Sequence, residues 1–148
     1  MKSKTITLCA SASFYKGINQ IKEDLIKLGF IVLIPHTASI MQKNNDFNVA
    51  HYKTWITSGD YNKKKKLMDG HFKKIVKGDS ILVINNTKHG VKGYIGGNVL
   101  MEMAIAYFLN KKIYVLNAMS KKLSIYEEVM GLSPTILNGD ITKVSILI

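Results

Sequence analysis

Apolar runs of strand length alternate with stretches of helical spacing along the first part of this chain. Residues 5–10 predict a first strand, and residues 16–28 predict an amphipathic helix that ends at Gly29. The inward positions of that helix are Ile18, Ile21, Leu25 and Leu28. The continuous apolar run 30–35, closed by Pro35, predicts a second strand that is covered on both faces.

The segment 36–60 has no clean period, so we expect a loop with a short helix. Its length makes it a candidate lid over a binding site. Three of its residues, Phe47, His51 and Trp55, recur at helical spacing. Its aromatic side chains, Tyr52 included, either stack on a nucleobase or pack the segment onto the core.

Helices and strands continue to alternate after this segment. In order, we expect a Lys-rich helix over 61–77, a strand over 81–85, an apolar helix around Glu102, a strand over 111–117, a helix near 123–130 and a weak strand near 135–137. The tail 141–148 is either another strand or a packed extension. This alternation predicts a single domain, 1–148, with a doubly wound (Rossmann/flavodoxin-like) α/β fold and a parallel five-stranded sheet.

Length and cysteine content place the chain among soluble proteins. A chain of 148 residues suits one domain with a substantial core, and the single Cys9 cannot form an internal disulfide. No leader pattern and no apolar run of membrane-spanning length is present in the sequence. We therefore expect a cytoplasmic protein without a membrane partner.

The net charge of +11 favours anionic ligands. All 21 basic residues are Lys, however, whereas specific reading of nucleic acid relies heavily on Arg. We expect a small-molecule ligand and no nucleic-acid partner.

Glu102 is the only charged residue in the 18 positions from 93 to 110. The surrounding residues leave no polar face, so we expect a helix that is buried nearly all round. An unpaired buried carboxylate costs several kcal/mol, so Glu102 is paired with a Lys or Tyr, protonated, or used in chemistry. Gly96 and Gly97 permit a tight turn and close approach of a ligand, and Asn98 can cap the helix.

Three loops should meet at the carboxyl edge of the predicted sheet. They are residues 11–15, residues 85–97, which begin with Asn85, and the loop after Leu116. Ser11 and Ser13 precede a helix, where their hydroxyls and backbone N–H groups either hold a phosphate or simply cap the helix.

Asp69 and His71 lie in the middle of the Lys-rich helix, and His71 is close to its apolar face. Either residue is a candidate acid or base, and the alternative for His71 is an ordinary position at the core boundary. The four histidines and the single cysteine show no paired ligand spacing, so we expect no metal and no other cofactor. The run 63–66 (KKKK) is a solvated helix face or steers an anionic partner.

About 40 residues, 78–117, resemble the second half of the nucleoside 2-deoxyribosyltransferase family, which includes 2'-deoxynucleoside 5'-phosphate N-hydrolases. The resemblance lies in an acidic residue (Asp79), a buried strand, a glycine-rich loop, a Glu one turn into a helix, a small-residue stretch and a further strand. It implies that Glu102 is the nucleophile that attacks the anomeric carbon of the sugar. The loop with Ser11 resembles the phosphate-binding loop of the hydrolases.

The chain departs from the family at several places. The family's catalytic Asp, eight residues before the position of Asp79, is His71 here, and Asp69 is two residues away. Glycine (Gly96 or Gly97) replaces the usual serine before the nucleophile. The aromatic residue that often ends the first strand of the family is not at its expected place, unless Tyr15 substitutes for it. The lysine-decarboxylase-like nucleoside-monophosphate phosphoribohydrolases also place Gly-Gly before a helical Glu, but their Gly-Thr step is absent here.

Two functions follow from the resemblance. The first is an N-glycosidase or deoxyribosyltransferase that acts on a nucleoside or its 5'-monophosphate, with Glu102 as nucleophile and His71 or Asp69 as acid/base. The second is a non-catalytic nucleotide-binding module of the same fold. The resemblance also implies a homodimer or larger assembly, consistent with the apolar helix around Glu102.

Overall fold

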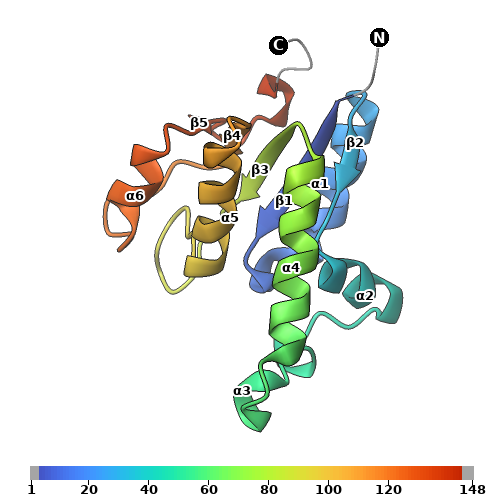
Figure 1. The fold of residues 1–148 in the computed structure, drawn as a ribbon. Coiled ribbons are helices and arrows are strands. Elements are labelled where there is room, and N and C mark those ends of the chain that lie inside the picture. Colours follow the sequence, from blue (N-terminus) through green and yellow to red (C-terminus); the bar gives the residue numbers. More distant parts are fainter. Residues whose placement is uncertain (1–3, 145–148) are drawn as a thin grey trace.

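The computed structural model describes residues 4–144 and forms one parallel sheet in the order β2-β1-β3-β4-β5 (Figure 1). The strands are β1 (Thr5–Ala10), β2 (Ile31–Leu33), β3 (Ser80–Ile84), β4 (Lys112–Val115) and β5 (Thr135–Ile136). All four neighbouring pairs run parallel. This order is one of the common doubly wound arrangements, in which the chain reverses its direction of growth between β1 and β3. The expected five-stranded α/β fold is confirmed.

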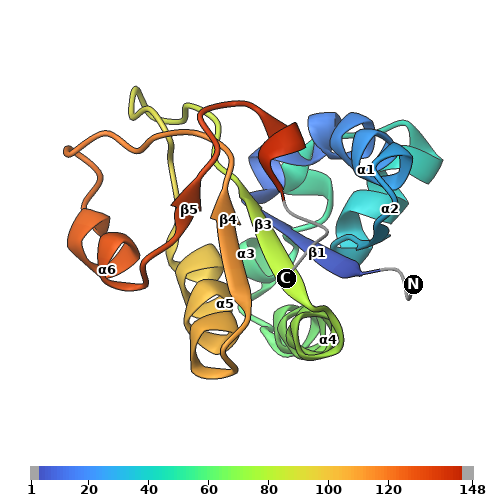
Figure 2. The same ribbon diagram turned by 90° about the horizontal axis from the view of Figure 1, so that it is seen from above.

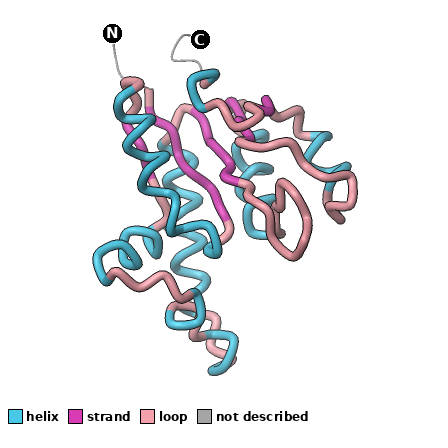
Figure 3. Tube along the Cα trace, turned by 180° about the vertical axis from the view of Figure 1, so that it is seen from behind, coloured by secondary structure: helices cyan, strands magenta, loops and turns pink. Residues whose placement is uncertain are grey.

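Helices lie on both faces of the sheet, as Figures 1 and 3 show from opposite sides. The α-helices are α1 (Ile18–Lys27), α2 (His36–Asn44), α3 (Trp55–Ser58), α4 (Asn62–Lys77), α5 (Gly97–Phe108) and α6 (Tyr126–Gly131). Three short 3-10 helices are η1 (Ala12–Gly17), η2 (Val49–His51) and η3 (Ile141–Lys143). The predicted helix 16–28 is therefore divided into η1 and α1.

The core consists of two apolar clusters, one on each face of the sheet. Alternate residues of β1 enter different clusters: Ile6 and Leu8 pack with α1 residues such as Leu25, whereas Cys9 packs with α4 and α5 residues. Because the central strands contribute to both clusters, β3 is buried at all five positions. Figure 2 shows this layered arrangement from above.

The second strand differs from its prediction. The run 30–35 forms only the three-residue β2, whose Ile31 is 53% exposed. β2 pairs only with β1 and is an edge strand, so one side of it is not covered by the sheet. The expectation of a strand covered on both faces was wrong, because an apolar run does not distinguish a central strand from an edge strand.

The helix around Glu102 is also less buried than expected. α5 turns Val99, Glu102, Met103 and Ala106 inward. Its other side exposes large apolar side chains, namely Met101, Tyr107 and Phe108, followed by Leu109 just after the helix. The helix is buried on one face only. The exposed residues form a strip that we call the α5 apolar strip.

The segment 36–60 holds more helix than the sequence indicated. It contains α2, η2 and α3, which lie beside the lower part of α4 in Figure 1. In the tail, η3 and the buried Val144 pack on the core, and residues 145–148 of the predicted tail lie outside the described residues. Within 4–144, no helix is both long enough and apolar enough to cross a membrane.

Candidate active site

A pocket of about 250 Å³ opens at the carboxyl edge of the sheet, beside the point where the strand order reverses. Ala10 and Ser11 line it from the end of β1, and Gly96 and Gly97 from the start of α5. The segment 36–60 and α4 contribute further walls. Ligands of doubly wound folds bind at this place, because the loops that follow the strands diverge there. The pocket is the candidate active site.

Glu102 lies at the bottom of this pocket and is 4% exposed. Its Oε2 atom is buried and has no hydrogen-bond partner among the described residues. Burial raises the pKa of Glu102 from 4.5 to about 8, against the smaller opposing effects of the Cys9 thiol and the Lys64 charge. The carboxyl group is therefore mostly protonated at pH 7. If the carboxyl loses this proton when a ligand binds, the ligand contacts a carboxylate that has no hydrogen-bond partner on Oε2 among the described residues.

His71 is a basic group beside this carboxyl. α4 turns it inward, where it is 7% exposed, and its Nε2 lies 3.8 Å from Glu102 Oε2. Burial, and next the charge of Lys74, lower the pKa of His71 from 6.5 to about 4. Both groups are uncharged at pH 7, so the pair is a neutral acid 3.8 Å from a neutral base.

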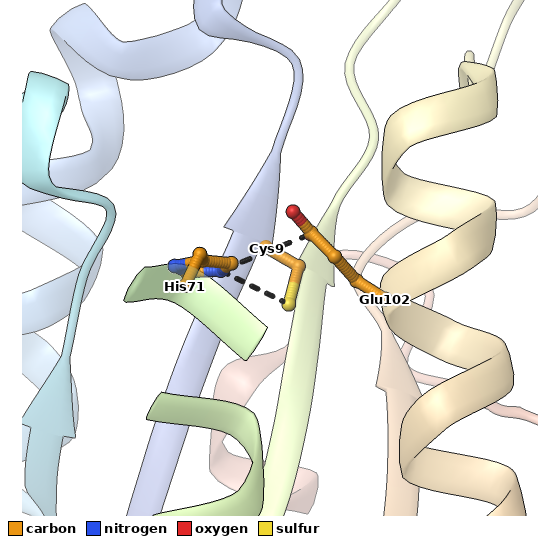
Figure 4. A group of neighbouring side chains, drawn as sticks. All are labelled: Cys9, His71 and Glu102. Atoms are coloured by element: carbon orange, nitrogen blue, oxygen red, sulfur yellow. Dashed lines mark hydrogen bonds and ion pairs between the residues drawn. The ribbon is translucent and has the colours of Figure 1, made fainter. Parts of the chain in front are cut away.

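Cys9 completes a buried cluster with these two residues, as Figure 4 shows. Its Sγ lies 3.7 Å from His71 Nε2. Burial, followed by the charge of Glu102, raises the pKa of the Cys9 thiol well above its usual value. The three side chains come from β1, α4 and α5, so no spacing along the sequence could reveal this cluster.

The pKa values of the pair predict how stability depends on pH. From pH 4.5 to about 8 the folded chain retains the Glu102 proton that the unfolded chain has lost, so this group lowers the free energy of unfolding as pH rises. His71 has the opposite effect between about 4 and 6.5, because the unfolded chain holds its proton there. The two effects offset each other below pH 6.5, and above it only the Glu102 effect remains.

We therefore expect the free energy of unfolding to fall between pH 6.5 and 8, by on the order of 1 kcal/mol. Urea denaturation at both pH values measures it. Glu102→Gln carries no proton in this range and should show no such fall. An equal fall in the variant would assign the pH dependence to another group.

Lysines gather at the entrance of the pocket. Lys53, Lys64 and Lys88 line it from three different segments. Burial, and next the charges of Lys88 and Lys64, lower the pKa of Lys53. Lys88 Nζ also donates a hydrogen bond to Ser11 Oγ at 3.1 Å. An anionic group bound here would relieve the repulsion among these lysines.

Aromatic side chains form another part of the pocket wall. Tyr52 and Trp55 reach it from the segment 36–60, and Tyr15 from η1. Trp55 is only 7% exposed and lies under Lys64, whose Nζ is 5.5 Å from the ring centre. Trp55 therefore packs the segment onto α4 as well as lining the pocket. Phe47 does not line the pocket.

The start of α5 differs in detail from the sequence prediction. Gly96 occupies the N-cap position and Asn98 lies inside the first turn, so Asn98 is not the cap. Both residues, and Gly97 between them, still line the pocket. A Cβ on Gly97 would meet no atom within 4 Å, so the space beside this glycine in the pocket wall is open.

Three predicted site residues lie elsewhere. Ser13 is exposed and does not line the pocket. Asp69 points away on α4, where its carboxylate pairs with Lys65 at 3.0 Å. Asn85 is fully buried, and its side chain donates to Asn117 O at 2.7 Å and accepts from Asn117 N at 2.8 Å, which ties together the loops after β3 and β4. Asn85 therefore supports the site without entering it.

Comparison with protein-family models gave no match for this chain, and a search of curated proteins gave none either.

Proposed function

We propose that the protein cleaves the N-glycosidic bond of a nucleoside or nucleoside 5'-monophosphate, as an N-glycosidase or deoxyribosyltransferase. One observation carries the proposal: Glu102 is buried in the wall of a pocket, its Oε2 has no hydrogen-bond partner in the part of the chain that the structure describes, and it lies 3.8 Å from His71 Nε2. A buried carboxyl without a structural partner is costly to keep, which favours a role in chemistry. The resemblance of residues 78–117 to the deoxyribosyltransferase family supports the same role.

The chemistry begins with a proton transfer. Glu102 passes its proton to His71 Nε2, and the resulting carboxylate attacks C1' of the sugar. The bond from C1' to the base nitrogen breaks, and the base leaves with its bonding electron pair and takes the proton from His71. The sugar remains as an ester of Glu102. Water then cleaves the ester in a hydrolase, whereas a second base accepts the sugar in a transferase.

The entrance lysines support a phosphorylated substrate. If Lys53, Lys64, Lys88 and Ser11 surround the 5' group, a nucleoside 5'-monophosphate should bind more tightly than its nucleoside, by about 1.5–3 kcal/mol for charge-assisted hydrogen bonds. Calorimetric titration of both ligands measures the difference. Lys88→Met should remove most of it, and the control Lys27→Met on α1 should retain it. Equal affinities of the wild type for both ligands would contradict a phosphate subsite.

A second function has its own support. The pKa of about 8 keeps Glu102 protonated at pH 7, and a neutral carboxyl can hold a sugar hydroxyl without attacking it. The absence of the family Asp at position 71 also favours a non-catalytic nucleotide-binding module. The two functions separate in one experiment. Incubation with a panel of nucleosides and 5'-monophosphates, read for free base by chromatography, yields base from an enzyme and none from a binding module.

The α5 apolar strip supports a homodimer or larger assembly. Phe108 is 84% exposed and Tyr107 53% exposed, so neighbouring large apolar side chains remain uncovered in the single chain. We expect light scattering to give at least twice the 16.6 kDa chain mass. Phe108→Glu should shift the protein towards monomer, and Ile26→Glu on the opposite face should not. A monomer mass for the wild type would contradict the proposed homodimer or larger assembly.

A further inference from the structure

We propose that Cys9, His71 and Glu102 form a binding site for a thiophilic divalent cation such as Zn²⁺. Their ligand atoms all lie within 4.8 Å of one another, and all three residues are buried (Figure 4). His71 and Glu102 also line the pocket. Glu102 is 4% exposed, and its Oε2 atom has no hydrogen-bond partner within residues 4–144, so this oxygen is available as a ligand.

The spacing of the three atoms fits tetrahedral coordination. Zn²⁺ binds sulfur at ~2.3 Å and nitrogen or oxygen at ~2.0–2.2 Å, so two ligand atoms of one tetrahedral ion lie roughly 3.3–3.6 Å apart. The structure places Cys9 Sγ 3.7 Å from His71 Nε2, and His71 Nε2 3.8 Å from Glu102 Oε2. Movements of a few tenths of an ångström would bring these two distances into that range, and the ligand atoms of Cys9 and Glu102 lie within 4.8 Å of each other.

The chemistry of the donor set selects the metal. A thiolate, an imidazole and a single carboxylate suit Zn²⁺ or Co²⁺, whereas Mg²⁺ and Ca²⁺ require several oxygen ligands. Binding releases the Cys9 thiol proton and the Glu102 proton to solvent. Three protein ligands leave a fourth position, and this position faces the pocket because Glu102 lines it.

The site has a consequence for the proposed function. A carboxylate that coordinates a metal is not free to attack C1', so bound Zn²⁺ should suppress base release, and a chelator should restore it. This consequence rests on the proposed function, whereas the binding itself does not. Metal binding is therefore measured without substrate, and the two proposals fail independently.

The experiment uses Co²⁺ and Zn²⁺ with the full chain. Co²⁺ should give a thiolate-to-cobalt charge-transfer band in the near ultraviolet at one ion per chain, and Zn²⁺ should displace it. Cys9→Ala should abolish the band, and His71→Gln and Glu102→Gln should weaken Zn²⁺ binding by about a hundredfold or more, since loss of supporting residues alone costs 10- to 100-fold. Circular dichroism establishes that each variant is folded.

The matched control is the exposed pair in which His51 Nδ1 lies 2.7 Å from Asp46 Oδ2. This pair also joins a histidine to a carboxylate but lacks a thiol, and His51→Gln should leave the cobalt band and the Zn²⁺ affinity unchanged. Absence of the band in the wild type would overturn the proposal. So would Zn²⁺ binding that His71→Gln and Glu102→Gln leave intact, because the ion would then be held at the surface.

Discussion

Glu102→Gln should lower the rate of base release by at least about a thousandfold while the protein remains folded. The amide has nearly the same shape as the carboxyl but cannot become an anionic nucleophile. At pH 7 the wild-type carboxyl is mostly neutral, because burial raises its pKa to about 8, so the substitution exchanges one neutral group for another. The melting temperature at pH 7 should therefore hold or rise.

The control for this variant is Glu23→Gln, the same substitution at an exposed position of α1 that does not line the pocket. Its rate should equal that of the wild type within about twofold. Rates are measured as free base released from the best substrate of the panel. A Glu102→Gln variant with wild-type turnover would exclude the nucleophile role, and a large loss of thermal stability would instead show a structural ion pair.

His71→Gln should lower the same rate by roughly 10²- to 10⁴-fold, the usual contribution of general acid or base catalysis. Glutamine can still form hydrogen bonds but cannot take the Glu102 proton and pass it to the leaving base. The loss should appear in kcat more than in KM, because proton transfer occurs in the reaction step. A loss confined to KM would make His71 a binding residue.

Two further variants sharpen the assignment of the acid/base. Asp69→Asn removes an exposed carboxylate that pairs with Lys65 outside the pocket, and should change the rate by less than about twofold. His71→Asp introduces the residue of the deoxyribosyltransferase family and should retain more activity than His71→Gln. A reversed order, with Asp69→Asn inactive and His71→Gln active, would return the role to Asp69.

The fold could be predicted because the central strands are continuous apolar runs in the sequence, and such runs indicate strands that are buried on both faces. The bounds of β1 agree with the prediction, since apolar residues fill both faces of a central strand. β2 could not be placed in the same way. Its position at the edge depends on the order of the whole sheet, which no local pattern contains. The exposure of Phe108 on α5 has the same origin, because the composition of a helix does not tell which face meets the core.

The site could be predicted where a residue conflicts with its surroundings. Glu102 was found because a lone carboxyl in an apolar helix is costly, and His71 because it lies near the apolar face of its helix. Sequence reasoning missed Cys9, Lys53 and Lys88, whereas Lys64 belongs to the run 63–66 that is a candidate for steering an anionic partner. Cys9 reads as an ordinary core residue of a strand, and Lys53 and Lys88 do not stand out in a chain whose basic residues are all Lys. Only the fold brings them to the pocket.

Ser11 and Ser13 show that the sequence does not tell which of two nearby side chains reaches the pocket. Both hydroxyls stand before a helix in the sequence, but the backbone after β1 turns Ser11 towards Lys88 and leaves Ser13 exposed. Asp69 and His71 differ likewise, because a separation of two residues places side chains on different faces of a helix. Sequence patterns therefore pointed to segments that contribute to the pocket, and the backbone geometry decided which residue of each segment lines it.

The proposed mechanism requires that Glu102 forms a covalent bond with C1' of the sugar. Intact mass spectrometry of protein that is acid-quenched during turnover tests it most directly, followed by peptide mapping of the modified residue. If Glu102 is the nucleophile, its mass should increase by one sugar or sugar-phosphate residue, and this increase should be absent in Glu102→Gln. Release of base with no adduct on Glu102, or with an adduct on another residue, would contradict it.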